Sequence, residues 1–181
     1  MAEYEAILFD FDGVLVDSEP VHFECWRAIL EPFGIPLDWK TYSEHCIGIS
    51  DRAMLASLCV QKDPPLDLNL LIPEYPKKKQ MFRDRMIQHP CVTPETLALL
   101  NELSAYKMAV VTSSGRSEVE PILEACGIRD RFQAAVFGGD VENLKPAPDP
   151  YLLAMKRLGV GRALVVEDSA PGEQSGLAAG C

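Results

Sequence analysis

Short apolar runs recur along the chain, separated by stretches in which apolar residues repeat every three or four positions. The runs are residues 6–9, 107–111, 134–137 and 163–166. Because they lack the alternating polar positions of a half-exposed strand, they predict strands buried on both faces. From the second run onward, predicted strands and helices alternate, as in a parallel sheet covered by helices. We therefore predict an α/β fold built on a doubly wound, Rossmann-like parallel sheet.

A long stretch after the first predicted strand shows no strand-like pattern. Apolar residues repeat every four positions from Val21 to Phe33, which predicts one helix. Further helices are predicted at 41–46, 52–60 and 75–88. We therefore predict a discontinuous α/β core, residues 1–15 and 92–181, and a helical insert, residues 16–91.

Each predicted strand ends in polar residues or in glycine. In a parallel sheet the carboxyl ends of the strands meet at one edge, where ligands bind. The groups at these ends are Asp10 with Asp12, residues 112–115, residues 138–145, and Glu167 with Asp168. We expect them to lie close together.

Asp10 and Asp12 lie one residue apart after the first strand and precede Gly13. Two ionised carboxylates in such a place lose hydration and repel each other, unless a cation or a shared proton compensates. The pair predicts a metal site or an acid–base site, and the alternative is that both residues only cap a turn. A calcium-binding EF-hand loop fits less well, because Gly13 comes too early and Phe11 and Val14 make the surroundings strand-like.

Composition narrows the class of protein. The chain has 181 residues, and 27 Asp and Glu against 17 Lys and Arg give a net charge of −10. This excess of negative charge argues against nucleic acid or an anionic membrane as partner. No apolar run approaches the ~20 residues of a membrane span, so we expect a soluble cytoplasmic protein. The six cysteines show no metal-binding spacing, and we expect them to be reduced.

Four short motifs follow one another at the predicted strand ends. They are Asp10-Phe11-Asp12-Gly13-Val14-Leu15-Val16-Asp17-Ser18, Val110-Val111-Thr112-Ser113-Ser114, Lys145-Pro146-Ala147-Pro148-Asp149 and Val165-Val166-Glu167-Asp168-Ser169-Ala170-Pro171-Gly172. In this order they resemble the haloacid dehalogenase superfamily, and the resemblance covers nearly the whole chain. It points to the subgroup with a helical cap after the first strand, which includes β-phosphoglucomutase and related sugar-phosphate phosphatases. Such proteins usually continue with one more core strand and helix, whereas this sequence stops at Gly180-Cys181.

The resemblance implies a role for each residue at the strand ends. Asp10 would attack phosphorus to form an aspartyl-phosphate, and Asp12 would act as acid and base. Magnesium would be held by Asp10, the backbone carbonyl of Asp12, Asp168 and Glu167. Lys145 would offset negative charge. Donors to the phosphate would come from Thr112, Gly13, Ser113 and Ser114. Taken singly, Lys145 could be a solvated loop residue, Thr112 could end a strand, and Glu167 with Asp168 could cap the next helix.

Within the insert, three residues resemble substrate-binding positions of the same subgroup. His22 falls near the cap hinge, Lys79 near a hinge lysine, and Arg52 near an arginine that binds phosphate. The arginine of the Gly-x-Ser-Arg pattern is here replaced by Asp51, and Arg52 comes one place late. This departure argues against a sugar-bisphosphate mutase. For His22 the alternative is a surface residue beside Trp26, one helical turn later.

We therefore expect a Mg2+-dependent phosphatase that hydrolyses a small phosphorylated metabolite, such as a sugar phosphate, and that is a monomer or a weak dimer. A phosphohexomutase resembling β-phosphoglucomutase is the alternative among enzymes. A dehalogenase fits less well, because that chemistry needs neither a metal nor Asp12. The alternative of another class is a non-catalytic phosphate-binding module, and the presence of Asp10, Asp12, Lys145 and Asp168 argues against it.

Overall fold

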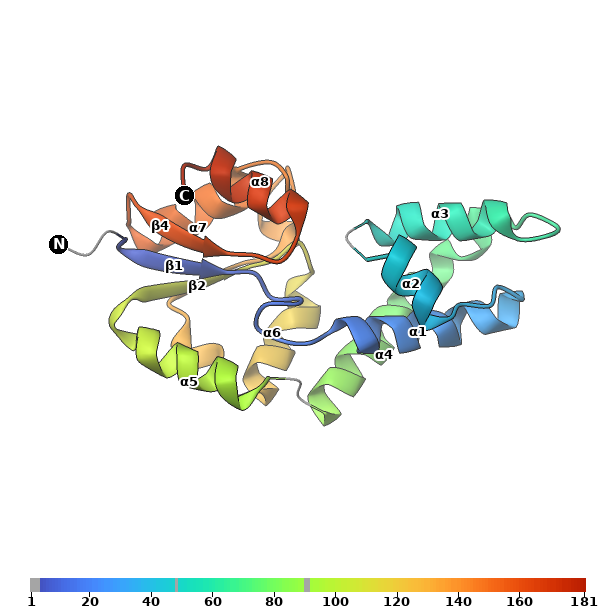
Figure 1. Ribbon diagram of the computed structural model, residues 1–181, viewed down its shortest axis with the longest axis horizontal. Helices are drawn as coiled ribbons and strands as arrows, with labels where there is room; N and C mark the ends of the chain where they lie inside the picture. The colour runs from blue at the N-terminus through green and yellow to red at the C-terminus, as the bar shows by residue number, and fades with distance from the viewer. Residues whose placement is uncertain (1–3, 48, 90–91) are drawn as a thin grey trace. The chain divides into compact units, whose positions relative to one another are not determined.

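The computed structural model describes residues 4–47, 49–89 and 92–181. Gly48 of the Gly-x-Ser-Arg comparison and Cys91, at the predicted end of the insert, lie outside the described residues. The chain divides into two compact units (Figure 1). The core unit comprises the chain up to Ser18 together with Ile87–Cys181, and the cap unit comprises Glu19–Met86. These divisions lie a few residues away from the boundaries expected after residues 15 and 91.

The core unit is built on a four-stranded parallel sheet with strand order β3-β2-β1-β4. Its strands are β1 (Ala6–Phe9), β2 (Lys107–Val111), β3 (Ala134–Val136) and β4 (Ala163–Val166). β1 is central, with Phe9 opposite both Val110 of β2 and Val166 of β4. All four residues of β1 are buried, as expected for an apolar run without alternation. The predicted α/β fold is confirmed.

Helices cover both faces of this sheet. They are α5 (Pro94–Glu102), α6 (Arg116–Ala125), α7 (Asp149–Leu158) and α8 (Ala170–Ala178). Figure 1 shows α7 and α8 on one side of the strands and α5 and α6 on the other. Tyr151, Ala154 and Leu158 of α7 share a buried cluster with the strand residues Ala6 and Ala109. Small strand residues leave room for the helix, so α7 packs closely against the sheet.

The described residues of the cap unit form helices and connecting loops, without a strand. Its helices are α1 (Glu19–Leu30), α2 (Trp39–His45), α3 (Asp51–Gln61) and α4 (Tyr75–Gln88), whose last residues pass into the core unit. Side chains cap two of these helices: the Asp38 carboxylate accepts from the Thr41 N–H at 2.7 Å, and the Ser50 hydroxyl accepts from the Ala53 N–H at 3.2 Å. The buried side chains that hold the helices together include Trp26, Leu30, Leu55 and Leu71.

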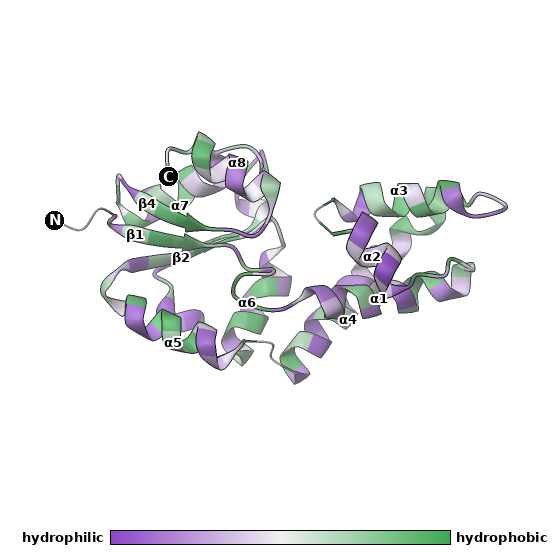
Figure 2. Ribbon diagram, viewed as in Figure 1, coloured by the Kyte–Doolittle hydropathy of each residue, from purple (hydrophilic) through white to green (hydrophobic). Residues whose placement is uncertain are grey.

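Short 3-10 segments connect several of these elements. They are Glu31–Phe33, Leu68–Leu70, Ile72–Glu74, Leu103–Ala105, Arg129–Arg131 and Gly138–Asp140. Figure 2 shows that the core strands are hydrophobic, whereas the helices carry polar and hydrophobic residues together. Within the described part of the chain, no helix combines the length and the apolar character needed to cross a membrane.

Candidate active site

The carboxyl ends of the strands bring predicted catalytic residues to one edge of the core sheet. Asp10 follows β1, Thr112 follows β2, and Glu167 and Asp168 follow β4. The Asp10 N–H donates to the Val166 carbonyl at 3.0 Å, which continues the sheet hydrogen bonding past the end of β1. The backbone of Asp10 is therefore held by the central strand and its neighbour.

Lys145 lies among these groups. Its Nζ is 2.9 Å from Asp10 Oδ1, pairs with Glu167 Oε1, and donates to the Val111 carbonyl at 2.8 Å. The side chain is only 6% exposed. Because an ammonium has three N–H bonds and three acceptors surround it here, the orientation of Lys145 is well defined. This position suits a residue that offsets the negative charge of Asp10.

Two hydroxyl groups hold the carboxylate of Asp12. Ser18 donates to Oδ1 at 2.6 Å, and Ser114 donates to Oδ2 at 3.3 Å. Ser18 is fully buried and is not among the predicted site residues, although it is the last residue of the first motif. A hydroxyl can donate to a carboxylate or accept from a carboxylic acid, so this arrangement suits a group that gains and loses a proton.

The residues predicted to bind phosphate differ in their surroundings. Thr112 is 2% exposed, and its Oγ1 accepts from the Ser114 N–H at 3.0 Å, whereas Ser113 is exposed. Gly13 has a φ of +72°, and a Cβ at this position would lie 1.9 Å from Asp168 Oδ2. A residue with a side chain would therefore displace Asp168, which explains why glycine follows the aspartate pair.

Three carboxylates converge at this edge. Asp10, Glu167 and Asp168 each offer an oxygen, and these oxygens lie within 4.8 Å of one another. Burial raises the pKa of Asp10 to about 7; Lys145 opposes this rise and Glu167 adds to it. Burial, together with Glu167, also raises the pKa of Asp168. A bound cation would offset the cost of ionising these carboxylates, and a set of hard oxygen donors fits Mg2+.

A second polar cluster lies within the cap unit. Nδ1 of His22 is 2.6 Å from Nζ of Lys78, and the His22 ring stacks on Phe82 with centroids 3.9 Å apart. The Lys78 side chain is 3% exposed, and its Nζ is 3.8 Å from the carboxylate of Asp51. Trp26 Nε1 donates to the other Asp51 oxygen at 3.2 Å. These contacts join α1, α3 and α4.

Two of the residues predicted in the insert have exposed side chains. Lys79 is exposed, and the buried lysine of α4 is its neighbour Lys78. A sequence signal for this exists, because Lys78, Phe82 and Met86 follow at four-residue intervals and so share one face of the helix. Arg52 is exposed on α3. Of the three predicted cap residues, only His22 belongs to the cluster around Lys78.

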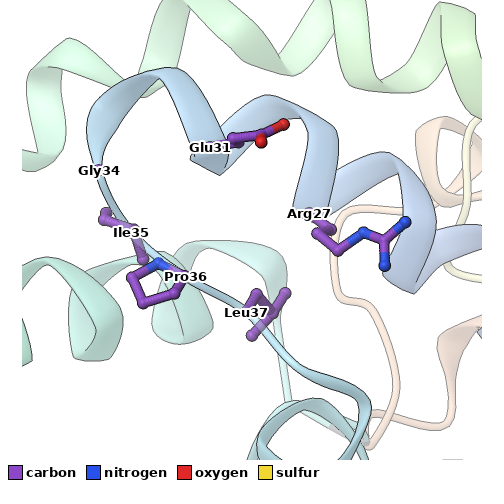
Figure 3. A pocket seen from close by; sticks show the side chains of 6 residues that line it. All are labelled: Arg27, Glu31, Gly34, Ile35, Pro36 and Leu37. Atoms are coloured by element: carbon purple, nitrogen blue, oxygen red, sulfur yellow. The ribbon is translucent and has the colours of Figure 1, made fainter.

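The cap unit also has a hollow of about 480 Å³ (Figure 3). It is lined by Arg27, Glu31, Gly34, Ile35, Pro36 and Leu37. The Arg27 guanidinium pairs with Glu24 at 2.6 Å. None of the residues predicted to act on substrate lines this hollow, so the strand ends of the core unit remain the candidate active site.

Comparison with known proteins agrees with this arrangement. Residues 7–181 match the family model described as haloacid dehalogenase-like hydrolase. The chain belongs to this family. The predicted resemblance is therefore confirmed. Relatives that are named phosphatases also confirm the assignment of the chain as an enzyme, a phosphoric monoester hydrolase of the haloacid dehalogenase type.

Relatives of this haloacid dehalogenase-like hydrolase include named phosphatases. It is 32% identical over 179 residues to the phosphorylated carbohydrates phosphatase of Thermotoga maritima, covering 97% of this chain and 82% of the relative. It is 30% identical over 184 residues to the fructose-1-phosphate phosphatase YqaB of Escherichia coli, covering 98% and 93%. Among solved structures, CbbY from Rhodobacter sphaeroides in complex with phosphate has a similar fold, with a TM-score of 0.79 and 27% sequence identity. The match covers 98% of this chain and 83% of CbbY.

Proposed function

We propose that this haloacid dehalogenase-like hydrolase is a Mg2+-dependent phosphatase that cleaves a small sugar phosphate through an aspartyl-phosphate. The observation that carries the proposal is the 2.9 Å ion pair between Asp10 and Lys145, beside carboxylate oxygens that lie within 4.8 Å of one another. The printed names of two relatives, which refer to phosphorylated carbohydrates and to fructose-1-phosphate, support a sugar phosphate as substrate.

Asp10 supplies the nucleophile. One of its carboxylate oxygens bonds to phosphorus while the bond from phosphorus to the alcohol oxygen breaks, which leaves an aspartyl-phosphate. Asp12, in its acid form, gives a proton to the departing alkoxide and later takes one from the water that attacks phosphorus. That attack releases phosphate and regenerates the Asp10 carboxylate. Ser18 and Ser114 hold Asp12 in place for both proton transfers.

Positive charge around the phosphoryl group lowers the barrier to both steps. Lys145 lies beside Asp10 and stabilises the negative charge shared between the nucleophile and the phosphoryl oxygens. When bound by Asp10, Glu167 and Asp168, Mg2+ supplies further positive charge at those oxygens. The site thereby compensates charge that would otherwise repel an anionic substrate.

A phosphohexomutase is the second candidate. The contact of His22 with the buried Lys78 favours it, because the family resemblance predicts a hinge histidine and a hinge lysine. Asp51 argues against it: this carboxylate stands where an arginine would bind a second phosphate, and it is already engaged by Trp26 and Lys78. Since like charges repel, hydrolysis of a monophosphate is the better fit.

The test is a screen of phosphorylated sugars, with and without Mg2+, on the wild type and two variants. We expect the wild type to release phosphate only with Mg2+, and Asp10→Asn to lose activity by on the order of 10³-fold or more. Asp130→Asn is the matched control, because Asp130 is exposed in the segment Arg129–Arg131. Near-normal hydrolysis by Asp10→Asn would refute the proposal. Interconversion of phosphate positions after priming with a sugar bisphosphate would favour the mutase.

A further inference from the structure

Tyr151 brings a single polar atom to the buried side of the active site. It lies on α7, is fully buried, and packs among apolar residues that include Ala6, Ala154 and Leu158. Its hydroxyl donates to Glu167 Oε1 at 2.5 Å. A phenylalanine would serve the apolar packing equally well, so the hydroxyl calls for an explanation of its own.

Glu167 is held from several directions. Oε1 accepts from Lys145 and from Tyr151, and Oε2 accepts from the Ser169 hydroxyl at 3.1 Å. A Cβ added to Gly172 would lie 2.0 Å from the Glu167 carboxylate, so the first turn of α8 closes another side. The side chain is 5% exposed. Its carboxylate therefore has little freedom to rotate.

The two donors to Glu167 Oε1 should respond differently when a divalent cation binds. Lys145 is charged and is shared with Asp10 and the Val111 carbonyl, so a divalent cation bound by Asp10 and Glu167 would repel it. Tyr151 is neutral, and the described residues offer its hydroxyl one acceptor, Glu167. Its hydrogen bond can persist while the ion pair between Lys145 and Glu167 weakens.

We infer that Tyr151 is a positioning residue for the metal site: its hydroxyl holds Glu167 in the orientation from which this carboxylate binds the divalent cation. The inference rests on the proposed function, since it requires that Asp10, Glu167 and Asp168 bind Mg2+. Partners of metal ligands commonly matter in this way, because an oriented ligand loses less conformational freedom when the metal binds.

The experiment compares Tyr151→Phe with the wild type and with Tyr42→Phe. Tyr42 is the matched control, because it is also buried and its hydroxyl also donates to a carboxylate, Glu19 Oε2 at 2.8 Å, within the cap unit. Each variant of the full chain is titrated with MgCl2, and Mg2+ binding is measured by calorimetry and by the rise in melting temperature, without substrate. Tyr151→Phe should bind Mg2+ about 10- to 100-fold more weakly, and Tyr42→Phe should bind it as the wild type does.

The possible results separate this inference from the proposed function. If Tyr151→Phe binds Mg2+ as tightly as the wild type and is only less stable, the hydroxyl is a structural group and the inference is overturned. Equal weakening in Tyr42→Phe would also overturn it, because the effect would then follow from general loss of stability. If the wild type itself shows no binding of Mg2+, the proposed metal site fails, and the inference fails with it.

Discussion

The core unit and the cap unit each bury a lysine, but the two lysines have different surroundings. The side chains of Lys145 and Lys78 are 6% and 3% exposed, so neither ammonium is hydrated as it would be at a surface. Lys145 pairs with two carboxylates, those of Asp10 and Glu167. Lys78 has one carboxylate, that of Asp51 at 3.8 Å, together with a histidine nitrogen and the faces of two aromatic rings.

The balance of charge separates the two clusters. In the core unit, Asp10 and Glu167 both pair with one lysine, and Asp168 adds a third carboxylate to the cluster. The pKa of Asp10 is raised mainly by burial, and the negative charge of Glu167 adds to the rise. In the cap unit, one carboxylate balances Lys78, and the aromatic faces add cation–π attraction. A buried charge alone therefore does not indicate catalysis. An unbalanced cluster that an added cation would complete is the stronger sign.

Replacing the core lysine should have the largest effect. Lys145→Met removes the positive charge beside Asp10 and leaves two buried carboxylates facing each other, so kcat/KM should fall by on the order of 10³-fold. Steady-state kinetics at saturating Mg2+ measure this loss. Lys156→Met, at an exposed position on α7, is the control. A loss of less than about tenfold in Lys145→Met would show that the core cluster does not depend on this cation.

Removing one carboxylate should stabilise the metal-free enzyme. The pKa of Asp10 rises from 3.8 to about 7 on folding, so the folded state binds more protons than the unfolded state between these pH values. Stability therefore falls as the pH rises through this window, and the whole penalty is present above about pH 7. In EDTA at pH 8, Asp10→Asn should melt about 5 °C above the wild type, and the difference should shrink toward pH 4.

The charged groups around Asp10 determine whether Asp10→Asn melts above or below the wild type. Lys145 favours its ionised form, whereas Glu167 and Asp12 oppose it. Melting curves in EDTA from pH 4 to pH 8 provide the measurement. If the variant melts below the wild type at pH 8, the ion pair with Lys145 outweighs the cost of burial, and the core cluster is balanced as the cap cluster is.

Replacing the cap lysine should have the smallest effect on folding. Lys78→Met keeps the length of the side chain between Trp26 and Phe82. It removes an ion pair whose carboxylate, that of Asp51, is 42% exposed, so water can solvate this carboxylate after the change. The free energy of unfolding in urea should change by less than about 1 kcal/mol. Lys79→Met, at the exposed neighbouring position, is the control. A loss above about 3 kcal/mol would mean that the cap cluster depends on its ammonium as a structural element.

The strands and their order of appearance could be predicted because apolar runs reveal buried parallel strands directly. Residues 6–9, 107–111 and 163–166 were predicted with the bounds that the structure has, and the third strand ends one residue earlier than predicted, at Val136. Parallel strands end at a common edge, so this pattern also anticipated that Asp10, Thr112 and Asp168 would follow strands of one sheet.

Contacts between side chains were harder to predict. Lys77, Lys78 and Lys79 are adjacent in the sequence, and which one is buried depends on the phase of α4 relative to Phe82. The hydrogen bond of Tyr151 depends on how closely α7 approaches the end of β4, and no local pattern reports that distance. Such contacts arise only when distant segments pack together. The motifs therefore identified Asp10, Lys145 and Asp168, but they did not predict the contacts of Lys78 and Tyr151.

The central place of β1 has a consequence for biosynthesis. Ala6 pairs with Lys107 on one side and with Ala163 on the other, so the strand that precedes Asp10, the proposed nucleophile, is translated long before either neighbour. At ~5–20 residues per second, on the order of ten seconds separate β1 from its second partner. Until β2 emerges, β1 has neither of its neighbouring strands, while the whole cap unit emerges and can fold first. The earliest residues of the enzyme are therefore among the last to reach their native neighbours on the ribosome.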